Sequence, residues 1–428
     1  MSEKKISEIL QVVKNMNEKV TLLGIGPMSP TVIDASMECS IENDFPLFFI
    51  ASRNQIEKET LGGGYVEGWN QYGLSSYIHK RAEEMGYNGL LFKCRDHGGP
   101  WQRDEEYASK ISEEKSIKNA LESFKSDINA GFQLIHVDTS KDPYQGANLS
   151  YATAIKRVTD LVKSIEQYRL KQRFGAVSYE VSLEETNGEF SVIQEFGTFV
   201  DCLMKEIDNR RLPRPVFMVG NTGTLTRMDK NIGKIDPVIV TELHKITSRY
   251  NLVLKEHNAD YLDDYYLKMH PELGIGMSNV APEFAKLETE ALLALADIEE
   301  KYISINNIET INKSDFINVL FTHVKQSNKW KKWLIDKTAE VDFDNNSELK
   351  KTIISVNGHY FYNKKDVAEA RRILYKNLKD LGIEADAENY VKNNIKKGIQ
   401  RYVDAFNLKD LTSKIVEYSK YELNKLLV

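Results

Sequence analysis

Short apolar runs recur along the first two-thirds of the chain, and most are followed by a longer, charged stretch with helical periodicity. Several runs are almost continuously apolar, as expected of strands that are covered on both faces. We predict eight strands, at residues 21–26, 46–52, 89–94, 133–138, 174–181, 215–220, 251–257 and 272–277. A strand–helix alternation repeated eight times favours a parallel sheet closed into a (β/α)8 TIM barrel.

The pattern changes after Glu299. Residues 300–428 carry many Lys, Asn, Asp and Tyr, with helical periodicity over Lys364–Asp380, Ala387–Phe406 and Leu411–Leu427. The Asp-Asn-Asn-Ser stretch at 344–347 has the composition of a linker. We therefore predict two domains, a barrel over residues 1–300 and a mostly helical C-terminal extension over residues 301–428.

Composition narrows the class of protein. The 428 residues are 41% hydrophobic and 28% charged, with a net charge of -6 and interspersed signs, which disfavours a dedicated nucleic-acid-binding protein. No apolar run approaches the ~20 residues that a membrane span needs. The three scattered cysteines (Cys39, Cys94 and Cys202) suggest no disulfide framework, and the N-terminus is polar. We expect a cytoplasmic protein that binds neither nucleic acid nor membrane.

Polar side chains gather where the predicted strands end. In a (β/α)8 barrel the carboxyl ends of the strands form the face that holds the active site. The residues at these ends are Asn54, Gln55, Asp96, His97, His136, Asp138, Glu180, Asn221, His257 and Asp260.

Asp96-His97-Gly98-Gly99-Pro100 is the sharpest of these features. A His directly after a strand can place a ring nitrogen on a metal, while the adjacent Asp points elsewhere and can serve as a general base. The alternative is an Asp that caps the next helix beside a structural His. The strand-end position favours the functional interpretation.

His136 and Asp138 are two residues apart on one strand, so both side chains face the same way. They are candidates for a metal ligand and for a proton-transfer or supporting group. A buried His–Asp hydrogen bond with a structural role is the competing interpretation.

Glu180 lies in an apolar run, where an unpaired carboxylate is very unfavourable. It is either a metal ligand or acid–base group, or the partner of Arg53 or Lys255 in a structural ion pair. His257 is the second candidate for a metal-binding histidine. Mixed His and carboxylate ligation suits Zn²⁺, with Mn²⁺ or Co²⁺ as alternatives.

Two polar turns are candidate substrate sites. The glycine run Gly62-Gly63-Gly64 follows the second strand, and its backbone N–H groups are candidates to cradle an oxyanion; a mobile lid is the alternative. Asn221-Thr222-Gly223-Thr224 follows the sixth strand and suits sugar hydroxyls or phosphate.

Taken together, these motifs carry a family resemblance. The stretches PTVIDASME, ASRNQ with GGGYVEGW, RDHGGPWQ, NAGFQLIHVDTSKDP, EHNADYL and ETEALLALADIEEKY occur in this order over about residues 20–300. The sequence resembles the class II D-tagatose-1,6-bisphosphate aldolase non-catalytic subunit family, whose members are also described as metal-dependent ketose-phosphate epimerases.

The resemblance implies a TIM barrel of class II aldolase type, with Asp96 as the proton-transfer residue and His97 as a metal ligand. It places Glu180 and His257 among further site groups, and Asn54, Gln55, Asp138, Ser140 and Asp260 along the site. Two positions depart from the family pattern: Ile50 stands where the family has Glu, and Gly274 where it has Lys in the last strand.

The expected activity is retro-aldol chemistry on a phosphorylated ketose such as a tagatose or fructose bisphosphate, giving C4 epimerisation or aldol cleavage. The alternative is a non-catalytic stabilising subunit of a class II tagatose-bisphosphate aldolase. The expected partners are the sugar phosphate and either further copies of this chain or a catalytic aldolase subunit. A kinase of the P-loop type is disfavoured, because the sequence has no Gly-x-x-x-x-Gly-Lys-Ser/Thr loop.

Overall fold

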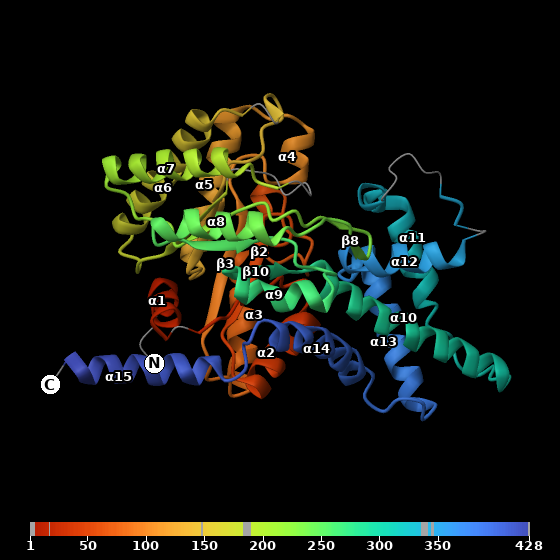
Figure 1. Ribbon diagram of the computed structural model, residues 1–428. Helices are drawn as coiled ribbons and strands as arrows, with labels where there is room; N and C mark the ends of the chain where they lie inside the picture. Colours follow the sequence, from red (N-terminus) through yellow and green to blue (C-terminus); the bar gives the residue numbers. More distant parts are fainter. Residues whose placement is uncertain are drawn as a thin grey trace.

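Eight parallel strands form a closed barrel in which β1 pairs with β2 on one side and β10 on the other (Figure 1). The computed structural model describes residues 5–16, 18–146, 149–182, 190–334, 341–343 and 346–426. The barrel strands are β1 (Leu22–Ile25), β2 (Leu47–Ser52), β3 (Leu91–Gly98), β4 (Leu134–Asp138), β5 (Ser178–Ser182), β6 (Phe217–Val219), β9 (Val253–Glu256) and β10 (Ile275–Val280). The predicted (β/α)8 barrel is confirmed.

Helices cover the outside of the barrel (Figure 1). They are α1 (Ile6–Met16), α2 (Pro30–Asn43), α3 (Gln71–Glu84), α4 (Asp104–Ala108), α5 (Glu113–Asn129), α6 (Tyr151–Lys171), α7 (Ile193–Arg210), α8 (Pro237–Arg249), α9 (Asp264–Leu273) and α10 (Pro282–Ile305), with a short 3-10 helix η1 at Glu59–Leu61. Local sequence sets their starts. At α2, for example, the Ser29 side chain accepts a hydrogen bond from the N–H of Val32, and Pro30 occupies the first turn.

The observed strand boundaries differ from the predicted ones by up to four residues, and β3, for example, runs from Leu91 to Gly98 rather than over 89–94. β5 begins at Ser178, because residues 174–177 precede the sheet. The last barrel strand is Ile275–Val280 rather than 272–277, since α9 continues through Leu273 and ends on Gly274, whose φ of 80° is the left-handed cap conformation. Gly274 therefore precedes the last strand, and the proposed correspondence between Gly274 and a lysine within that strand is wrong.

Helices also make up most of the chain after the barrel. They are α11 (Phe316–Ser327), α12 (Ser347–Asn357), α13 (Lys365–Asp380), α14 (Ala387–Ala405) and α15 (Leu411–Leu426), with 3-10 helices η3 (Lys329–Trp333) and η4 (Gly358–Phe361). Of the predicted linker, residues 344 and 345 lie outside the described residues, while Asn346 caps α12 and Ser347 begins it.

The C-terminal helices pack against the barrel layer. α14 contacts α2, α9 and α10, α12 and α13 contact α10, and α15 lies against α1, which brings the two ends of the chain together (Figure 1). Near the rim of the barrel, a two-stranded hairpin of β7 (Thr226–Arg227) and β8 (Lys230–Asn231) lies on the same side as α11 and α12 (Figure 1). The division into two domains at residue 300 stays a prediction.

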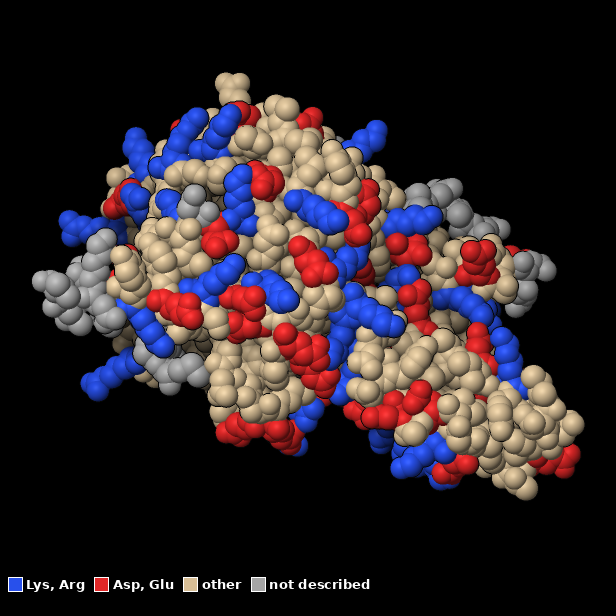
Figure 2. Space-filling model, turned by 60° about the horizontal axis from the view of Figure 1, so that its bottom comes forward, with Lys and Arg blue, Asp and Glu red and all other residues tan. Residues whose placement is uncertain are grey.

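The surface carries both signs of charge. On the face drawn in Figure 2, Lys and Arg are interspersed with Asp and Glu over the barrel helices and the C-terminal helices. Within the part of the chain that the structure describes, no helix combines the length and the apolar character that a membrane span requires.

Candidate functional site

Asp96 and His97 lie at the carboxyl end of β3, where the backbone departs from a regular strand. The β3–β4 register shifts between Arg95 and Gly98, and His97 has a φ of 44°, in the left-handed region that a non-glycine residue rarely adopts. Gly99 follows with a φ of 146°, and a Cβ at this position would lie 2.0 Å from the carbonyl oxygen of Asp138. The irregular turn thus holds His97 at the mouth of the barrel.

His97 is oriented by Asp138 from the next strand. Its Nδ1 is 2.6 Å from Oδ2 of Asp138, while Oδ1 of Asp138 accepts hydrogen bonds from the N–H and hydroxyl of Ser140. Burial opposes protonation of His97, but the Asp96 carboxylate and the hydrogen bond to Asp138 outweigh it and raise its pKa to about 9. The contact leaves Nε2 of His97 facing the other site residues, as carboxylate-oriented metal histidines do.

His136 is fully buried behind His97, and both of its ring nitrogens are engaged. Its Nδ1 lies 3.0 Å from the backbone N of His97 and accepts that N–H, and its Nε2 lies 3.0 Å from Oγ of Ser182. Burial lowers the pKa of His136 to about 4, so the ring is neutral. A neutral ring that accepts the His97 N–H fixes the irregular end of β3.

Glu180 of β5 joins a buried lysine and a buried histidine. Its Oε2 is 2.6 Å from Nζ of Lys255, and its Oε1 is 2.8 Å from Nε2 of His257. Burial alone would raise the pKa of Glu180, but Lys255, His136 and His257 hold it well below its usual range. The ion pair given as the alternative role of Glu180 therefore exists with Lys255 and not with Arg53, and it leaves Oε1 facing the histidines.

Asp96 faces the same space from β3. Oδ1 of Asp96 accepts a hydrogen bond of 3.1 Å from Nδ2 of Asn279 and lies 3.9 Å from Nε2 of His257. Oδ2 of Asp96 lies 3.9 Å from Nε2 of His97. Burial opposes ionisation, but His97, His257 and Lys255 lower the pKa of Asp96 below its ordinary value. The carboxylate is thus ionised and within reach of a bound ligand.

The donor set fits a divalent metal. The ring nitrogens of His97 and His257 face each other at 3.1 Å. Ligand atoms lie within 4.8 Å of one another in two overlapping groups, one of His97, His136 and His257, and one of Asp96, His136, Glu180 and His257. Imidazole nitrogens with carboxylate oxygens are the ligand set of catalytic Zn²⁺ sites, and also suit Mn²⁺ or Co²⁺.

Other predicted residues lie elsewhere on the rim. Asn54, Gln55, Gly63 and Gly64 line a cavity whose lining includes neither Asp96 nor the histidines of the candidate metal site. In the glycine run, the N–H groups of Gly62 and Gly63 already donate to the carbonyls of Glu59 and Lys58, so these two are not available to an oxyanion.

Asn221 and Asp260 are both buried. The backbone N–H of Asn221 donates to Oγ of Ser191, after β6. Oδ1 of Asp260 accepts the N–H groups of Ala281 and Glu283 at the start of α10, at 3.0 and 2.8 Å. These bonds turn Asp260 toward a helix end.

Sequence reasoning missed Asn279 and Ser182, which contact Asp96 and His136. Ser182 lies one residue beyond the predicted fifth strand, and Asn279 two residues beyond the predicted last one. A correct boundary at Gly274 would have placed Asn279 at a strand end, where barrel site residues occur.

The chain resembles known proteins in sequence family and in fold. Residues 6–184, less than half of the chain, match the family described as D-tagatose-1,6-bisphosphate aldolase subunit GatZ/KbaZ-like, so the resemblance to this family is confirmed. No curated protein matches the sequence significantly.

Solved structures resemble the chain over most of its length. A probable tagatose 6 phosphate kinase from Sinorhizobium meliloti 1021 superposes with a TM-score of 0.74 at 17% identity, covering 90% of this chain and 100% of that one. The YdjI aldolase from Escherichia coli K12 gives 0.50 at 11% identity, covering 95% and 98%. Fructose-bisphosphate aldolase from Campylobacter jejuni gives 0.51 at 10% identity, covering 95% and 94%. At these identities the likeness shows the fold, and the family match relates the chain to class II aldolases.

Proposed function

We propose that this chain catalyses metal-dependent retro-aldol chemistry on a phosphorylated ketose, at the site formed by Asp96, His97, Glu180 and His257. The observation that carries the proposal is the convergence of these side chains, with His136, from the three barrel strands β3, β4 and β5 and from the position directly after β9. A structural salt bridge does not require three histidines and two carboxylates around one space.

In this proposal His97 and His257, whose facing ring nitrogens lie 3.1 Å apart, would hold the metal, and Glu180, which is grouped with His257 but not with His97, is the candidate third ligand. Asp138 holds Nδ1 of His97, so Nε2 of His97 remains as a ligand atom. Lys255 pairs with Oε2 of Glu180, so Oε1 of Glu180 remains as a ligand atom. His136 acts by holding the backbone of His97, because its Nδ1 already accepts the His97 N–H. A divalent cation here supplies a Lewis acid for the ketose carbonyl oxygen, where negative charge develops as the carbon–carbon bond breaks.

Asp96 serves as the general base. It removes the proton from the C4 hydroxyl, C4 becomes an aldehyde, and the C3–C4 bonding pair moves to C3 and into the C2 carbonyl. Return of that proton to the C3 carbanion and release of the aldehyde complete a cleavage. Recombination with the aldehyde turned over returns the proton to the C4 oxygen and inverts C4. Asn279, which donates to Oδ1, holds the carboxylate in place.

The first experiment measures metal. Protein stripped with EDTA is titrated with Zn²⁺ by calorimetry and analysed for metal content. We expect stoichiometric binding that is lost in His97→Ala and retained in the control His79→Ala, whose side chain is exposed on α3. Full metal occupancy in His97→Ala would rule out this ligand assignment.

The second experiment measures turnover. The metal-loaded protein is incubated with a panel of ketose mono- and bisphosphates and followed by NMR for C4 epimers or triose fragments. Asp96→Asn should keep the metal and lose turnover by about 10²–10⁴-fold, the usual contribution of a positioned general base. Unchanged turnover in Asp96→Asn would contradict the role of Asp96.

A second function is supported by the family description, which names an aldolase subunit. In that case this chain stabilises a separate catalytic aldolase. It would show no turnover alone, and a catalytic class II aldolase chain would elute with it and gain thermal stability in its presence.

A further inference from the structure

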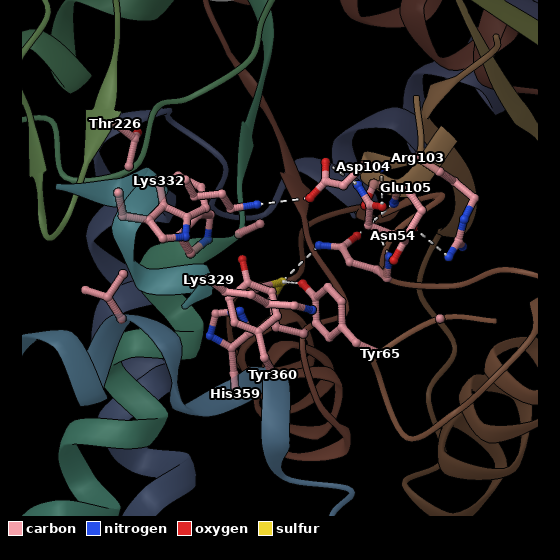
Figure 3. A pocket seen from close by; sticks show the side chains of 18 of the residues that line it. Asn54, Tyr65, Arg103, Asp104, Glu105, Thr226, Lys329, Lys332, His359 and Tyr360 are labelled. Carbon is pink, nitrogen blue, oxygen red and sulfur yellow. Dashed lines mark hydrogen bonds and ion pairs between the residues drawn. The ribbon is translucent and has the colours of Figure 1, made fainter. Parts of the chain in front are cut away.

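A cavity, which we call the rim cavity, opens between the barrel and the C-terminal part of the chain (Figure 3). It has a volume of about 390 Å³ and lies between the barrel rim and two stretches of the C-terminal part, residues 329–333 and 356–360, which we call the C-terminal segment. Ser52, at the end of β2, lines the cavity and is the register partner of Asp96 on β3. The rim cavity therefore reaches the end of the strand that pairs with the strand of Asp96.

The C-terminal wall of the rim cavity is fixed to the barrel. The N–H of Met228 in the β7–β8 hairpin donates to the carbonyl of Trp333 at 3.1 Å, and Nζ of Lys332 lies 3.1 Å from Oδ2 of Asp104 at the start of α4. The ring of Tyr360 packs edge-on against Tyr65 of the glycine loop, with 4.7 Å between ring centroids. Figure 3 shows the ion pair and the facing rings.

The wall also contains a buried histidine without a partner. His359 is 4% exposed, and neither of its ring nitrogens forms a hydrogen bond with the described residues. Burial, together with Lys332 and Lys329, lowers the pKa of His359 to about 3, so the ring is neutral and offers one N–H and one lone pair. Thr226 lies across the cavity and is 5% exposed. Its hydroxyl likewise forms no hydrogen bond with the described residues. Buried polar atoms left unpaired are costly, so they point to a ligand that pairs with them.

The cavity lining carries three cations, Arg103, Lys329 and Lys332, against two carboxylates, Asp104 and Glu105. Lys329 forms no ion pair with any described residue, and its ammonium lies 5.0 Å from the centroid of the Tyr360 ring. Lys332 forms an ion pair with Asp104, and a more highly charged anion can replace Asp104 as its partner. Phosphate accepts charge-assisted hydrogen bonds from ammonium groups and neutral N–H donors alike.

We infer that the rim cavity binds a phosphate group of the substrate, and that Lys329, Lys332 and His359 of the C-terminal segment supply its contacts. The inference rests on the proposed function for the identity of the ligand as a sugar phosphate. It gives the C-terminal segment a part in selecting substrates, because a sugar with an uncharged end leaves Lys329 and His359 unpaired.

The test uses inorganic phosphate and the full-length, metal-free protein. Binding is measured by calorimetry in a phosphate-free buffer containing EDTA, for the wild type and three variants. Lys329→Met removes an exposed cation, and His359→Leu removes two unpaired polar atoms, so both variants are expected to fold. The control is Lys331→Met in the same 3-10 helix, since Lys331 lies over the Trp330 ring and does not line the cavity.

We expect the wild type and Lys331→Met to bind phosphate equally, and Lys329→Met and His359→Leu to bind it about tenfold more weakly, the usual loss for a hydrogen bond to a charged group. Equal binding by all four proteins, or no binding by the wild type, would overturn the inference. Either result leaves the retro-aldol proposal standing, because metal titration and turnover test that proposal separately.

Discussion

At the scale of single residues, the placement of His97 depends on glycines that no other residue can replace. Gly99 has a φ of 146° and lies against the Asp138 carbonyl, and Gly98 packs against Phe124. A Cβ at either position would be too close to these atoms, so the Asp-His-Gly-Gly turn requires glycine at both positions for steric reasons.

Gly99→Ala should lower the free energy of unfolding by about 3 kcal/mol, since the new Cβ meets the Asp138 carbonyl in a strained backbone. Urea denaturation measures the change. The control is Gly175→Ala, where no atom lies within 4 Å of an added Cβ and φ is not positive, so stability should stay within about 0.5 kcal/mol. Equal stability of the two variants would contradict this explanation.

His359 predicts an acid-sensitive stability. Its folded-state pKa of about 3 lies below the unfolded value near 6.5, so the unfolded chain binds a proton between these values and the folded protein does not. Stability should therefore fall as pH drops below about 6.5, by about 2 kcal/mol at pH 5 from this group alone. The groups facing His359 are Lys329, Lys332, Tyr65 and Tyr360.

Thermal unfolding at pH 7 and pH 5 tests this prediction. The difference in Tm should be smaller in His359→Leu than in the wild type, because the variant has no imidazole to protonate on unfolding. An identical pH dependence in the two proteins would show that His359 does not remain neutral when folded.

The sequence could predict which residue types gather in the barrel, but not what each touches. Asp96, His97, Glu180 and His257 do converge, since strand ends meet at one face. The contact of His136 with the His97 backbone depends on the register shift in β3, which no local pattern reveals.

At the scale of elements, α10 starts on a cap that comes from another segment. Ala281, which precedes the helix, forms no side-chain cap, and Oδ1 of Asp260 accepts the N–H groups of Ala281 and Glu283 instead. Those N–H groups have no partner within the helix, so a remote carboxyl secures the start of the longest helix that lies against the barrel.

Asp260→Ala should lower the free energy of unfolding by about 2 kcal/mol, because it leaves two buried N–H groups unpaired. Burial, with the nearby Glu283 carboxylate, raises the pKa of Asp260 to about 8, so neutral Asn is its close match. Asp260→Asn should therefore retain most of the stability in chemical denaturation, and both variants should bind Zn²⁺ as the wild type does. Lost metal binding in Asp260→Asn would instead place Asp260 in the site.

The order of the strands was predictable from the sequence because apolar runs alternate with helical stretches. The beginning of the last strand was not, since Pro271 and Leu273 continue α9 and only the left-handed conformation at Gly274 ends that helix. The Glu-Leu-Gly-Ile-Gly-Met run at 272–277 has the same local pattern in a helix end and in a strand.

At the scale of the whole molecule, the C-terminal helices complete the barrel layer. On α14, Val391, Ile395, Ile399 and Tyr402 are fully buried, and this helix contacts α2, α9 and α10. The periodicity of residues 301–428 predicted helices, but where they dock depends on contacts between residues hundreds of positions apart, which local patterns do not encode.

A chain that ends after α10 should expose the apolar surface that α14 covers. We expect such a truncation to aggregate, because exposed contiguous apolar surface promotes association. Size-exclusion chromatography measures this against the full chain. A monodisperse truncated protein would show that the barrel folds independently and would support the domain boundary near residue 300.

The pairing of β1 with β10 has a consequence for how the protein is made. β1 ends at Ile25, and β10, its neighbour on the other side from β2, ends at Val280. About 250 residues must therefore be synthesised before β1 can pair with β10. At roughly 5–20 residues per second, the ribosome needs on the order of 10–50 seconds for that span. For that time one edge of β1 has no partner strand, and it is open to pairing with other chains until β10 has been made.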